Sequence, residues 1–473
     1  MPPATLRLSL PPPSGGRLGR GFPSRSLPSL HPLKYPQTPS PGGTPMPKYA
    51  IINARLIDGT GRAPQDGRAL LTYGPSIQQV KPTNSLRVPK DATVIDAAGQ
   101  VVMPGLIDPH THVAYHISDY ALNLREMTES VELNTIKAAT NAKTILDSGC
   151  TAIGDGGSRG YIGVAVRDAI TLGIIPGPKM VACGQILCGS GGIVDHSYAT
   201  GYHEDPAYFG TVVNGPHEVR VAVRKQMRQG VDMIKVSASG LPGDPMIGGR
   251  LQDLSYDELK AAADEAAKFG KTVHAHSHDV NGSIAAARAG IISLHSGEFM
   301  NEEALQVMKE TGCVFVPTIS WLHYRVSEDY ARAYNRSARP TDQQIQWFIN
   351  EVREAYEACK EAILLAHKIG APIAVGSDGA HVFPPFTVAK EMEYFQDLGI
   401  KPITILHEAT QVAAKAIGKQ DVWGTLEPSK SADVLIINGD PSKDVRILQN
   451  KDNIQLIMKD GVVLKDTFTG PGK

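Results

Sequence analysis

The chain has 473 residues, with 47 basic Lys and Arg residues against 48 acidic Asp and Glu residues and a formal net charge of −1 at pH 7. This balance argues against a surface for nucleic acid or an anionic membrane, and no apolar run reaches the roughly 18–20 residues that span a bilayer. The five cysteines are scattered without C-x-x-C spacing, which argues against a disulfide framework and a thiolate zinc site and favours a reducing, cytoplasmic environment. We therefore expect a small-molecule substrate, with no nucleic acid and no membrane as partner.

The first segment, residues 1–46, is rich in Pro, Ser and Gly, carries several arginines and contains no Asp or Glu. This composition predicts a disordered leader. An Arg- and Ser-rich segment without acidic residues also resembles an organellar transit peptide, although its prolines oppose the amphipathic helix of such peptides. Because Met46 stands just before the first patterned segment, a third alternative is an upstream extension that the working protein lacks.

Two terminal segments show short β-like runs between Gly, Pro and Asp turn signals. Residues 47–103 contain YAIINARLI, RALLTYG and ATVIDA, and residues 419–473 contain ADVLIING, IQLIMKDG and VVLKD. Their similar pattern predicts one small β-sandwich that is built from both ends of the chain.

The long middle, residues 104–418, alternates apolar runs with helical patterns such as SYDELKAAADEAAKFG, which opens with Ser and closes with Gly. This order is typical of parallel strands joined by crossover helices. Eight runs can be counted: VVMPGLID, CTAIGDGG, KMVACG, VDMIKVSAS, KTVHAHSH, GIISLHSG, CVFVPTIS and PIAVGSDG. They predict an α/β fold, a (β/α)8 TIM-type barrel with the chemistry at the C-terminal ends of its strands.

Polar residues stand at these strand ends: His110, His112, Lys235, His274, His276, His278, His295 and Asp378. Each of them alone has an ordinary structural explanation, such as a capped core histidine or an aspartate in a glycine turn. An unpaired ammonium inside the apolar fourth run, however, would cost several kcal/mol. Since all of them converge on one barrel mouth, we predict a metal centre there.

The whole pattern from about Tyr49 onward resembles the metal-dependent amidohydrolase superfamily, in particular its branch of imidazolonepropionase-like, prolidase-type and ochratoxinase-like hydrolases. The matching motifs are IDGTG, MPGLIDPHTH, MIKVSASG, AHSHDVNGSIAAARAG, AVGSDGA, EATQVAAKAIG and GTLEPSKSADVLIINGDPSKD. The resemblance implies that the lysine of MIKVSASG, Lys235, reacts with carbon dioxide to form a carbamate that bridges two divalent metals. A buried cation would thereby become an anion.

The resemblance also implies the other roles at this centre. His110, His112 and Asp378 would hold one metal and His276 the second, while Asp378 would take the proton of the attacking water and deliver it to the leaving amine. Imidazole and carboxylate suit zinc, although other transition metals bind the same ligand types. For His274 and His278 two roles stay open, orienting a neighbour or contacting substrate, and we assign His278 to substrate binding.

Two motifs depart from the branch. Relatives usually present Glu-His-Gly after the sixth strand, where this chain reads LHSG, so that Ser296 stands at the expected ligand position and the histidine is His295. Regular alternation through Ser296 would turn His295 away from the mouth, whereas a bulge or an early strand end would bring it to the metal. We expect His295 to be the ligand. The glycine-rich turn CGSGGIVDH has Gly191 where the branch tends to carry a histidine, and His196 is our candidate to replace it as a substrate contact.

We therefore predict a metal-dependent hydrolase of a C–N amide bond in a small molecule such as an N-acyl amino acid or a dipeptide, acting as a homo-oligomer. The alternatives are a cyclic amide or lactone hydrolase, a decarboxylase on the same metal platform, and a degenerate barrel that serves as a binding protein. Residues 321–366, between the seventh and eighth strands, are long, helical and aromatic. They form either a lid over the mouth or an ordinary outer helix pair.

Overall fold

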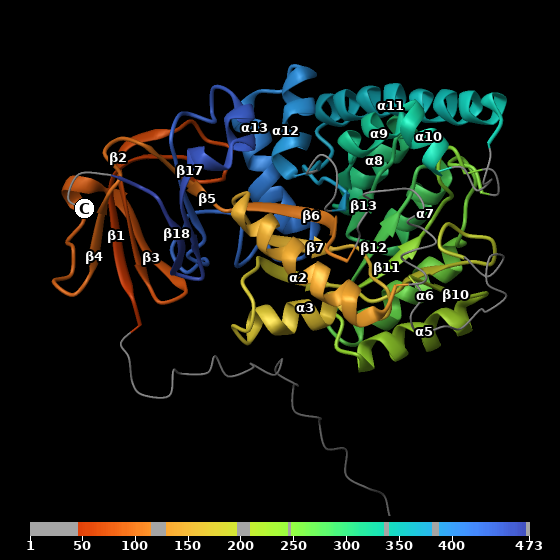
Figure 1. The fold of residues 1–473 in the computed structure, drawn as a ribbon, viewed down its shortest axis with the longest axis horizontal. Coiled ribbons are helices and arrows are strands. Elements are labelled where there is room, and N and C mark those ends of the chain that lie inside the picture. Colours follow the sequence, from red (N-terminus) through yellow and green to blue (C-terminus); the bar gives the residue numbers. More distant parts are fainter. Residues whose placement is uncertain are drawn as a thin grey trace, which may run out of the picture. The chain divides into compact units, whose positions relative to one another are not determined.

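The computed structural model describes residues 46–114, 129–195, 209–244, 247–334, 340–380 and 387–469. Residues 46–473 form one compact unit (Figure 1). The leader up to residue 45 and the candidate substrate contact His196 lie outside the described residues.

Strands from both ends of the chain build one sheet. Its order is β18-β17-β16-β5-β1-β2-β3, with β4 paired to β1. The strands are β1 (Lys48–Leu56), β2 (Gln65–Tyr73), β3 (Ser76–Pro82), β4 (Thr93–Asp96), β5 (Val101–Pro104), β16 (Val434–Ile437), β17 (Ile454–Lys459) and β18 (Val462–Asp466). The two ends meet where β16 pairs antiparallel with β5, and Figure 1 shows their strands together. The backbone hydrogen bonds thus join all eight strands into one sheet. That this sheet is divided into the two layers of a sandwich stays a prediction.

The middle of the chain supplies parallel strands in the order of the eight predicted runs. They are β6 (Leu106–His112), β7 (Cys150–Asp155), β8 (Lys179–Ala182), β11 (Met233–Ser237), β12 (Thr272–His276), β13 (Ser293–His295), β14 (Val314–Val316) and β15 (Gly379–Ala380), with β9 (Ile186–Cys188) and β10 (Gly210–Val212) added. Two sheets result, β15-β6-β7-β8 and β10-β9-β11-β12-β13-β14. The α/β class is therefore confirmed.

Backbone hydrogen bonds also connect these two parallel sheets at their margins. The Phe315 amide donates to Pro372 O at 2.8 Å and the Ala374 amide to Phe315 O at 2.8 Å, which ties β14 to the segment before β15. At the other margin the Asp232 amide, just before β11, donates to Ala182 O at 2.7 Å. Within the described residues, however, the strand ladders do not run in one closed ring.

Helices follow most of the strands, and their ends carry the predicted signals. Ser255 and Glu258 form a capping box at the start of α6, and α7 ends at Gly290 with φ of 95°. The helices are α2 (Val131–Asp147), α3 (Ile162–Thr171), α5 (Pro216–Arg228), α6 (Tyr256–Ala267), α7 (Val280–Ala289), α8 (Glu302–Thr311), α9 (Ile319–Arg325), α10 (Glu328–Tyr334), α11 (Asp342–Ile369), α12 (Val388–Asp397), α13 (Pro402–His407) and α14 (Ala413–Ala416).

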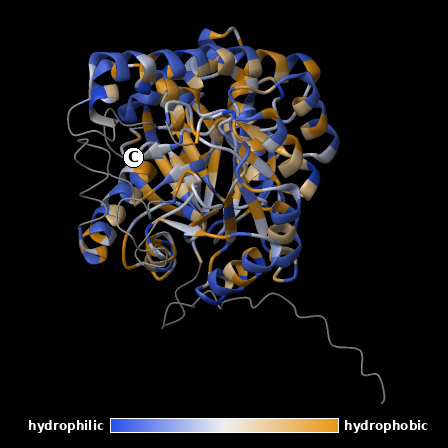
Figure 2. Cartoon of the chain, turned by 90° about the vertical axis from the view of Figure 1, so that its right-hand side faces the viewer, coloured by the Kyte–Doolittle hydropathy of each residue, from blue (hydrophilic) through white to orange (hydrophobic). Residues whose placement is uncertain are grey.

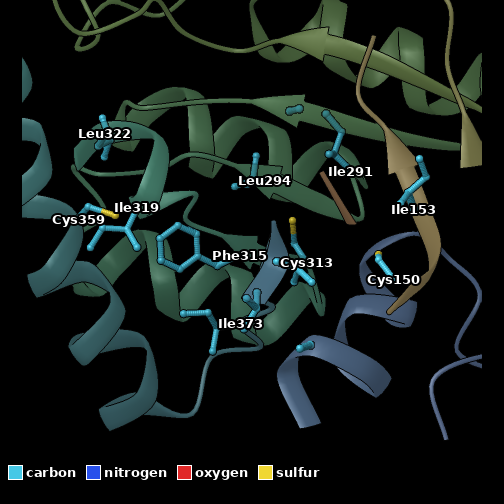
Figure 3. Packing of buried hydrophobic residues seen from close by; sticks show 14 of the residues in the cluster. Cys150, Ile153, Ile291, Leu294, Cys313, Phe315, Ile319, Leu322, Cys359 and Ile373 are labelled. Atoms are coloured by element: carbon cyan, nitrogen blue, oxygen red, sulfur yellow. The ribbon is translucent and has the colours of Figure 1, made fainter. Parts of the chain in front are cut away.

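Alternate residues of a parallel strand face two different cores. Phe315 belongs to the large core between strands and helices, whereas Val314 and Val316 belong to a second cluster with Ile107 and Met233 from other strands. Figure 2 shows hydrophobic residues gathered on the central strands, and Figure 3 shows Phe315 beside its bridge partner Ile373. The inner cluster is the arrangement expected for the interior of a barrel.

Among the described residues, no helix is both long and apolar enough to cross a membrane.

A chain that begins at Met46 is expected to match the full chain in thermal midpoint and in activity. The described core is built from residues 46–473, and the Pro-, Ser- and Gly-rich composition of the leader predicts that its removal leaves this core intact. Thermal unfolding of both chains, at equal protein concentration, checks this. A midpoint several degrees lower for the shorter chain would mean that the leader packs against the rest.

Candidate metal centre

Two histidines and an aspartate meet at the C-terminal end of β6. His110 and His112 alternate along this strand, so that both side chains lie on one face, and Asp378 stands just before β15, which pairs with β6. The Asp378 Oδ1 atom lies 3.0 Å from His110 Nε2 and 3.2 Å from His112 Nε2, and the two Nε2 atoms are 3.2 Å apart. Two imidazole nitrogens and a carboxylate oxygen at this spacing are a donor set that suits a divalent metal.

Both imidazoles turn their Nε2 atoms toward Asp378. Burial, assisted by the charge of Lys235, lowers the pKa of His110 to about 3, so that its ring is neutral at pH 7. The Nδ1 atom of His112 lies 3.0 Å from the carbonyl oxygen of Gly157, to which it can only donate a proton. This bond leaves the lone pair of His112 on Nε2, the atom that faces Asp378.

A glycine lets the backbone approach these two rings closely. A Cβ atom at Gly156 would lie 3.1 Å from Cδ2 and Nε2 of His110 and 3.1 Å from Cε1 of His112. Any side chain at this position would therefore press on the edges of both rings that converge on Asp378. The residues present thus fit a bound metal in ligand type and in the neutral form of His110, and glycine at position 156 avoids a clash with both rings.

Lys235 lies inside β11, and its side chain is buried with a relative exposure of 1%. Its Nζ atom lies 2.5 Å from Nδ1 of His295, which is an imidazole partner and not a carboxylate. Burial lowers the pKa of Lys235 to about 7, against the opposing effect of Asp378. A large fraction of this amine is therefore neutral near pH 7.

His295 lies in the same group because of the face that it occupies on β13. The strand stops at His295, and the backbone turns at Ser296 and Gly297 with φ of 76° and 94°. Leu294 faces the outer core, whereas the ring of His295 lies with its centroid 4.0 Å from that of His110. The strand pairs in regular register up to His295, so alternation places Ser293 and His295 on the face of Lys235, and the backbone turns only after His295.

His276 and His278 form a second group at the end of β12. Their ring centroids are 4.3 Å apart, and His276 Nε2 lies 3.3 Å from Gly240 O in the segment after β11. The Nδ1 atom of His278 is hydrogen-bonded to Glu298, and both side chains are buried. His278 Nε2 has no hydrogen-bond partner among the described residues.

His274 differs from its two neighbours, because hydroxyl groups occupy both of its ring nitrogens. Its Nε2 lies 3.1 Å from Thr272 Oγ1 and its Nδ1 lies 2.9 Å from Ser293 Oγ. The same Ser293 Oγ lies 3.0 Å from His295 Nε2. Of the two roles left open for His274, these contacts favour the orienting one.

The sequence interpretation missed three residues of this region. Asp108 accepts hydrogen bonds from both sides of the candidate centre, Glu298 binds His278, and Gly156 leaves room for the histidines. The signals were present as an Asp-Pro before His110, an acidic residue after LHSG, and a Gly pair after the second run. None of these signals shows which other segment the residue contacts, because the contacted segments are distant in the sequence.

The segment after β14 covers part of the strand ends. Arg325, at the end of α9, is buried and donates from Nη2 to Pro242 O at 2.8 Å, in the segment after β11. This contact joins the segments that follow β11 and β14, two strands between which β12 and β13 lie in the sheet. Arg325 also lies over the rings of Trp321, Tyr330 and Phe348. This arrangement favours the lid over an outer helix pair.

Comparison with known proteins identifies the family. The model of the amidohydrolase family matches residues 101–464, well over half of the chain. The chain belongs to the amidohydrolase family, whose members are hydrolases that generally use divalent metals. The group of His110, His112 and Asp378 makes a metal plausible in this member too.

Individual relatives agree with this assignment. Ochratoxinase of Aspergillus niger is 29% identical over 390 residues, which cover 78% of this chain and 77% of that protein. Imidazolonepropionase of Symbiobacterium thermophilum is 24% identical over 425 residues, 84% of this chain and 88% of that protein. Among solved structures, A. niger ochratoxinase has a TM-score of 0.77 at 27% identity, covering 90% of this chain and 98% of that one. A Xaa-Pro dipeptidase with methionine in its active site has a TM-score of 0.76 at 27% identity, covering 88% of this chain and 100% of that one.

Proposed function

We propose that this chain is a metal-dependent hydrolase that cleaves a C–N amide bond of a small molecule such as an N-acyl amino acid or a dipeptide. The observation that carries the proposal is the convergence of His110, His112 and Asp378, where Gly156 adds no side chain to press on the two rings. Family membership supports amide hydrolysis, and the names of the ochratoxinase and Xaa-Pro dipeptidase relatives support a small substrate.

The proposal includes a closed (β/α)8 barrel over residues 104–418, flanked by the two halves of a β-sandwich at 47–103 and 419–473. The inner cluster of alternate strand residues and the hydrogen bonds at both margins of the parallel sheets support closure. A cytoplasmic location and a homo-oligomeric state are further proposals. Five free, buried cysteines support a reducing compartment.

Two zinc ions would be held by this chain's own residues. His110, His112 and Asp378 would hold one, His276 and His295 the other, and carboxylated Lys235 would be shared between them. Carboxylation adds carbon dioxide to the neutral amine, forms an N–C bond and releases one proton, and the lowered pKa of Lys235 supports it. When bound, the metals would supply Lewis acidity that polarises the scissile carbonyl and acidifies water.

The side chains around the metals would do the rest. The Asp378 carboxylate would take the proton of the attacking water and deliver it to the nitrogen of the leaving amine. His278 would contact substrate through Nε2, which the bond between Nδ1 and Glu298 leaves available. His196, outside the described residues, stays a predicted substrate contact. The segment around Arg325 would exclude water from the mouth.

The first experiment is to count the metals in the purified full chain and to screen N-acyl amino acids, dipeptides and lactams. We expect two divalent metals per chain, amide turnover that is lost on chelation, and recovery when zinc is restored. Lactam turnover alone would favour the cyclic-amide alternative, which the imidazolonepropionase relative supports. A metal-free chain that binds these compounds without turnover would indicate a binding protein instead.

Gly156→Ala is expected to weaken metal binding strongly while the chain still folds. The added methyl group would lie 3.1 Å from both histidine rings and would displace one of them from Asp378. Zinc affinity of the metal-stripped protein, measured by equilibrium dialysis, checks this prediction. Gly248→Ala is a control for added bulk at a glycine, since a Cβ there meets no atom within 4 Å and its φ is not positive. Equal zinc affinity for both variants and the wild type would contradict the proposed centre.

A further inference from the structure

Asp108 is a buried carboxylate that none of the roles above uses, although it stands two residues before His110 in the same strand. Its Oδ1 atom accepts from the amide of His110 at 3.2 Å and from the amide of Ser377 at 3.1 Å. Its Oδ2 atom accepts from the hydroxyl of Ser377 at 2.5 Å. One side chain thereby joins β6, which carries the two histidines, to the segment that carries Asp378.

Asp378 needs such support because its backbone conformation is unfavourable. Its φ is 49°, in the left-handed region that residues other than glycine rarely adopt. The hydroxyl of Ser377 donates to Asp108 and at the same time accepts from the amide of Gly379 at 2.9 Å. The amide of Asp378 donates to His110 O at 2.8 Å. Hydrogen bonds on both sides of Asp378 therefore hold the strained turn that aims its carboxylate at His110 and His112.

We propose that Asp108 is a positioning residue, which holds the His110 and Asp378 donors at the separation that a metal requires. The inference rests on the proposed function. A carboxylate is the side chain that this position needs, because it accepts from three donors and donates to none. Asparagine would place an NH2 group against the Ser377 hydroxyl, which would then lose its acceptor. This explains why an Asp-Pro precedes the two histidines.

The test uses two variants that break the same contact from opposite sides, Asp108→Asn and Ser377→Ala. The matched control is Glu391→Gln. Glu391 is also a fully buried carboxylate, and it accepts from the amides of Ile319 and Ser320, each at 2.8 Å, but it does so at the start of α9. Glu391 is therefore, like Asp108, a buried carboxylate that accepts hydrogen bonds from backbone amides, but it lies at a place that holds none of the proposed ligands.

Two quantities are measured on metal-stripped, full-length protein: the affinity for Zn²⁺ alone, by equilibrium dialysis, and the thermal midpoint. We expect Asp108→Asn and Ser377→Ala to weaken Zn²⁺ binding about 10–100-fold, the range for residues that support metal ligands. Glu391→Gln is expected to lower the midpoint while its Zn²⁺ affinity stays within about twofold of the wild type. The double variant should lose little more affinity than either single one, because both remove one contact.

The outcomes separate this inference from the proposed function. If the wild type binds Zn²⁺ and both variants bind it equally well, the positioning role is wrong while the metal centre stands. If the three variants lose midpoint and affinity in the same proportion, Asp108 is an ordinary core residue and the inference is also wrong. If the wild type binds no Zn²⁺, the proposed function itself fails. If Asp108→Asn does not fold, Ser377→Ala alone is compared with the wild type and with Glu391→Gln.

Discussion

Replacing Lys235 by alanine is expected to remove most metal binding and to slow hydrolysis by roughly 10²–10³-fold or more, the range for losing one electrostatic stabiliser of the transition state. The reason is that Lys235 is buried beside His295 and close enough to Asp378 to feel its charge. No other side chain at this position can become a carbamate. Metal content by elemental analysis and turnover of an N-acyl amino acid or dipeptide measure both effects.

Two further substitutions show whether the amine itself matters. Lys235→Met has a similar length and no amine, so that it fills the same space and should keep the thermal midpoint while losing the metal. Short carboxylic acids should partly restore metal and activity in Lys235→Ala, where the removed side chain leaves room for them, and not in Lys235→Met. Lys235→Arg keeps a positive charge and cannot be carboxylated, so it should also be inactive.

The result that would contradict a carboxylated lysine is equally direct. If Lys235→Ala keeps wild-type metal occupancy and rate, no carbamate takes part. If Lys235→Ala loses the metal and acids never restore it, while Lys235→Met keeps the metal, Lys235 acts through packing alone. Removal of bicarbonate and carbon dioxide during metal loading of the wild type gives an independent check, because carboxylation needs them.

The sequence predicted the parts of this molecule that depend on local patterns. Seven of the eight apolar runs contain parallel strands in the predicted order, because strand periodicity and capping residues such as Ser255 are short-range signals, whereas PIAVGSDG forms an isolated bridge at Ile373 and a strand only from Gly379. The pairing of β16 with β5 also agrees with the expected union of both termini. Whether the strands from both termini form one layer or two depends on how their sheet twists, and no short segment encodes that twist.

The candidate site likewise contains residues that local patterns predicted and contacts between distant segments that they did not. His110 and His112 could be found from their spacing, and Lys235 from its apolar surroundings. The contact between Asp108 and Ser377 joins residues 269 positions apart, and the one between His278 and Glu298 depends on a turn after β13. A residue pattern gives a side chain's type and its face on a regular strand. It does not show which of two adjacent residues, His295 or Ser296, faces the interior, because that depends on the register of β13 with its neighbours.

His295→Ala is expected to lose about one metal per chain and most of the activity, whereas Ser296→Ala should keep both. The ring of His295 lies 4.0 Å from that of His110 and touches Lys235, within the group proposed to hold the metals. Ser296 is buried at the turn, where its backbone has a φ of 76°. Its contribution is therefore to the backbone and not to the metal.

Ser296→Gly sharpens this comparison. Glycine adopts the left-handed conformation readily, so that this variant should keep the metal and change the free energy of unfolding by no more than about 1 kcal/mol. His295→Gln is the matched variant at the neighbouring position, since it can still bond to Lys235 but offers no imidazole. Metal stoichiometry of all four variants, measured after loading with excess zinc, decides between the two residues. If the serine variants lose the second metal while His295→Ala keeps it, Ser296 is the ligand position after all, and the turn seen here must rearrange when metal binds.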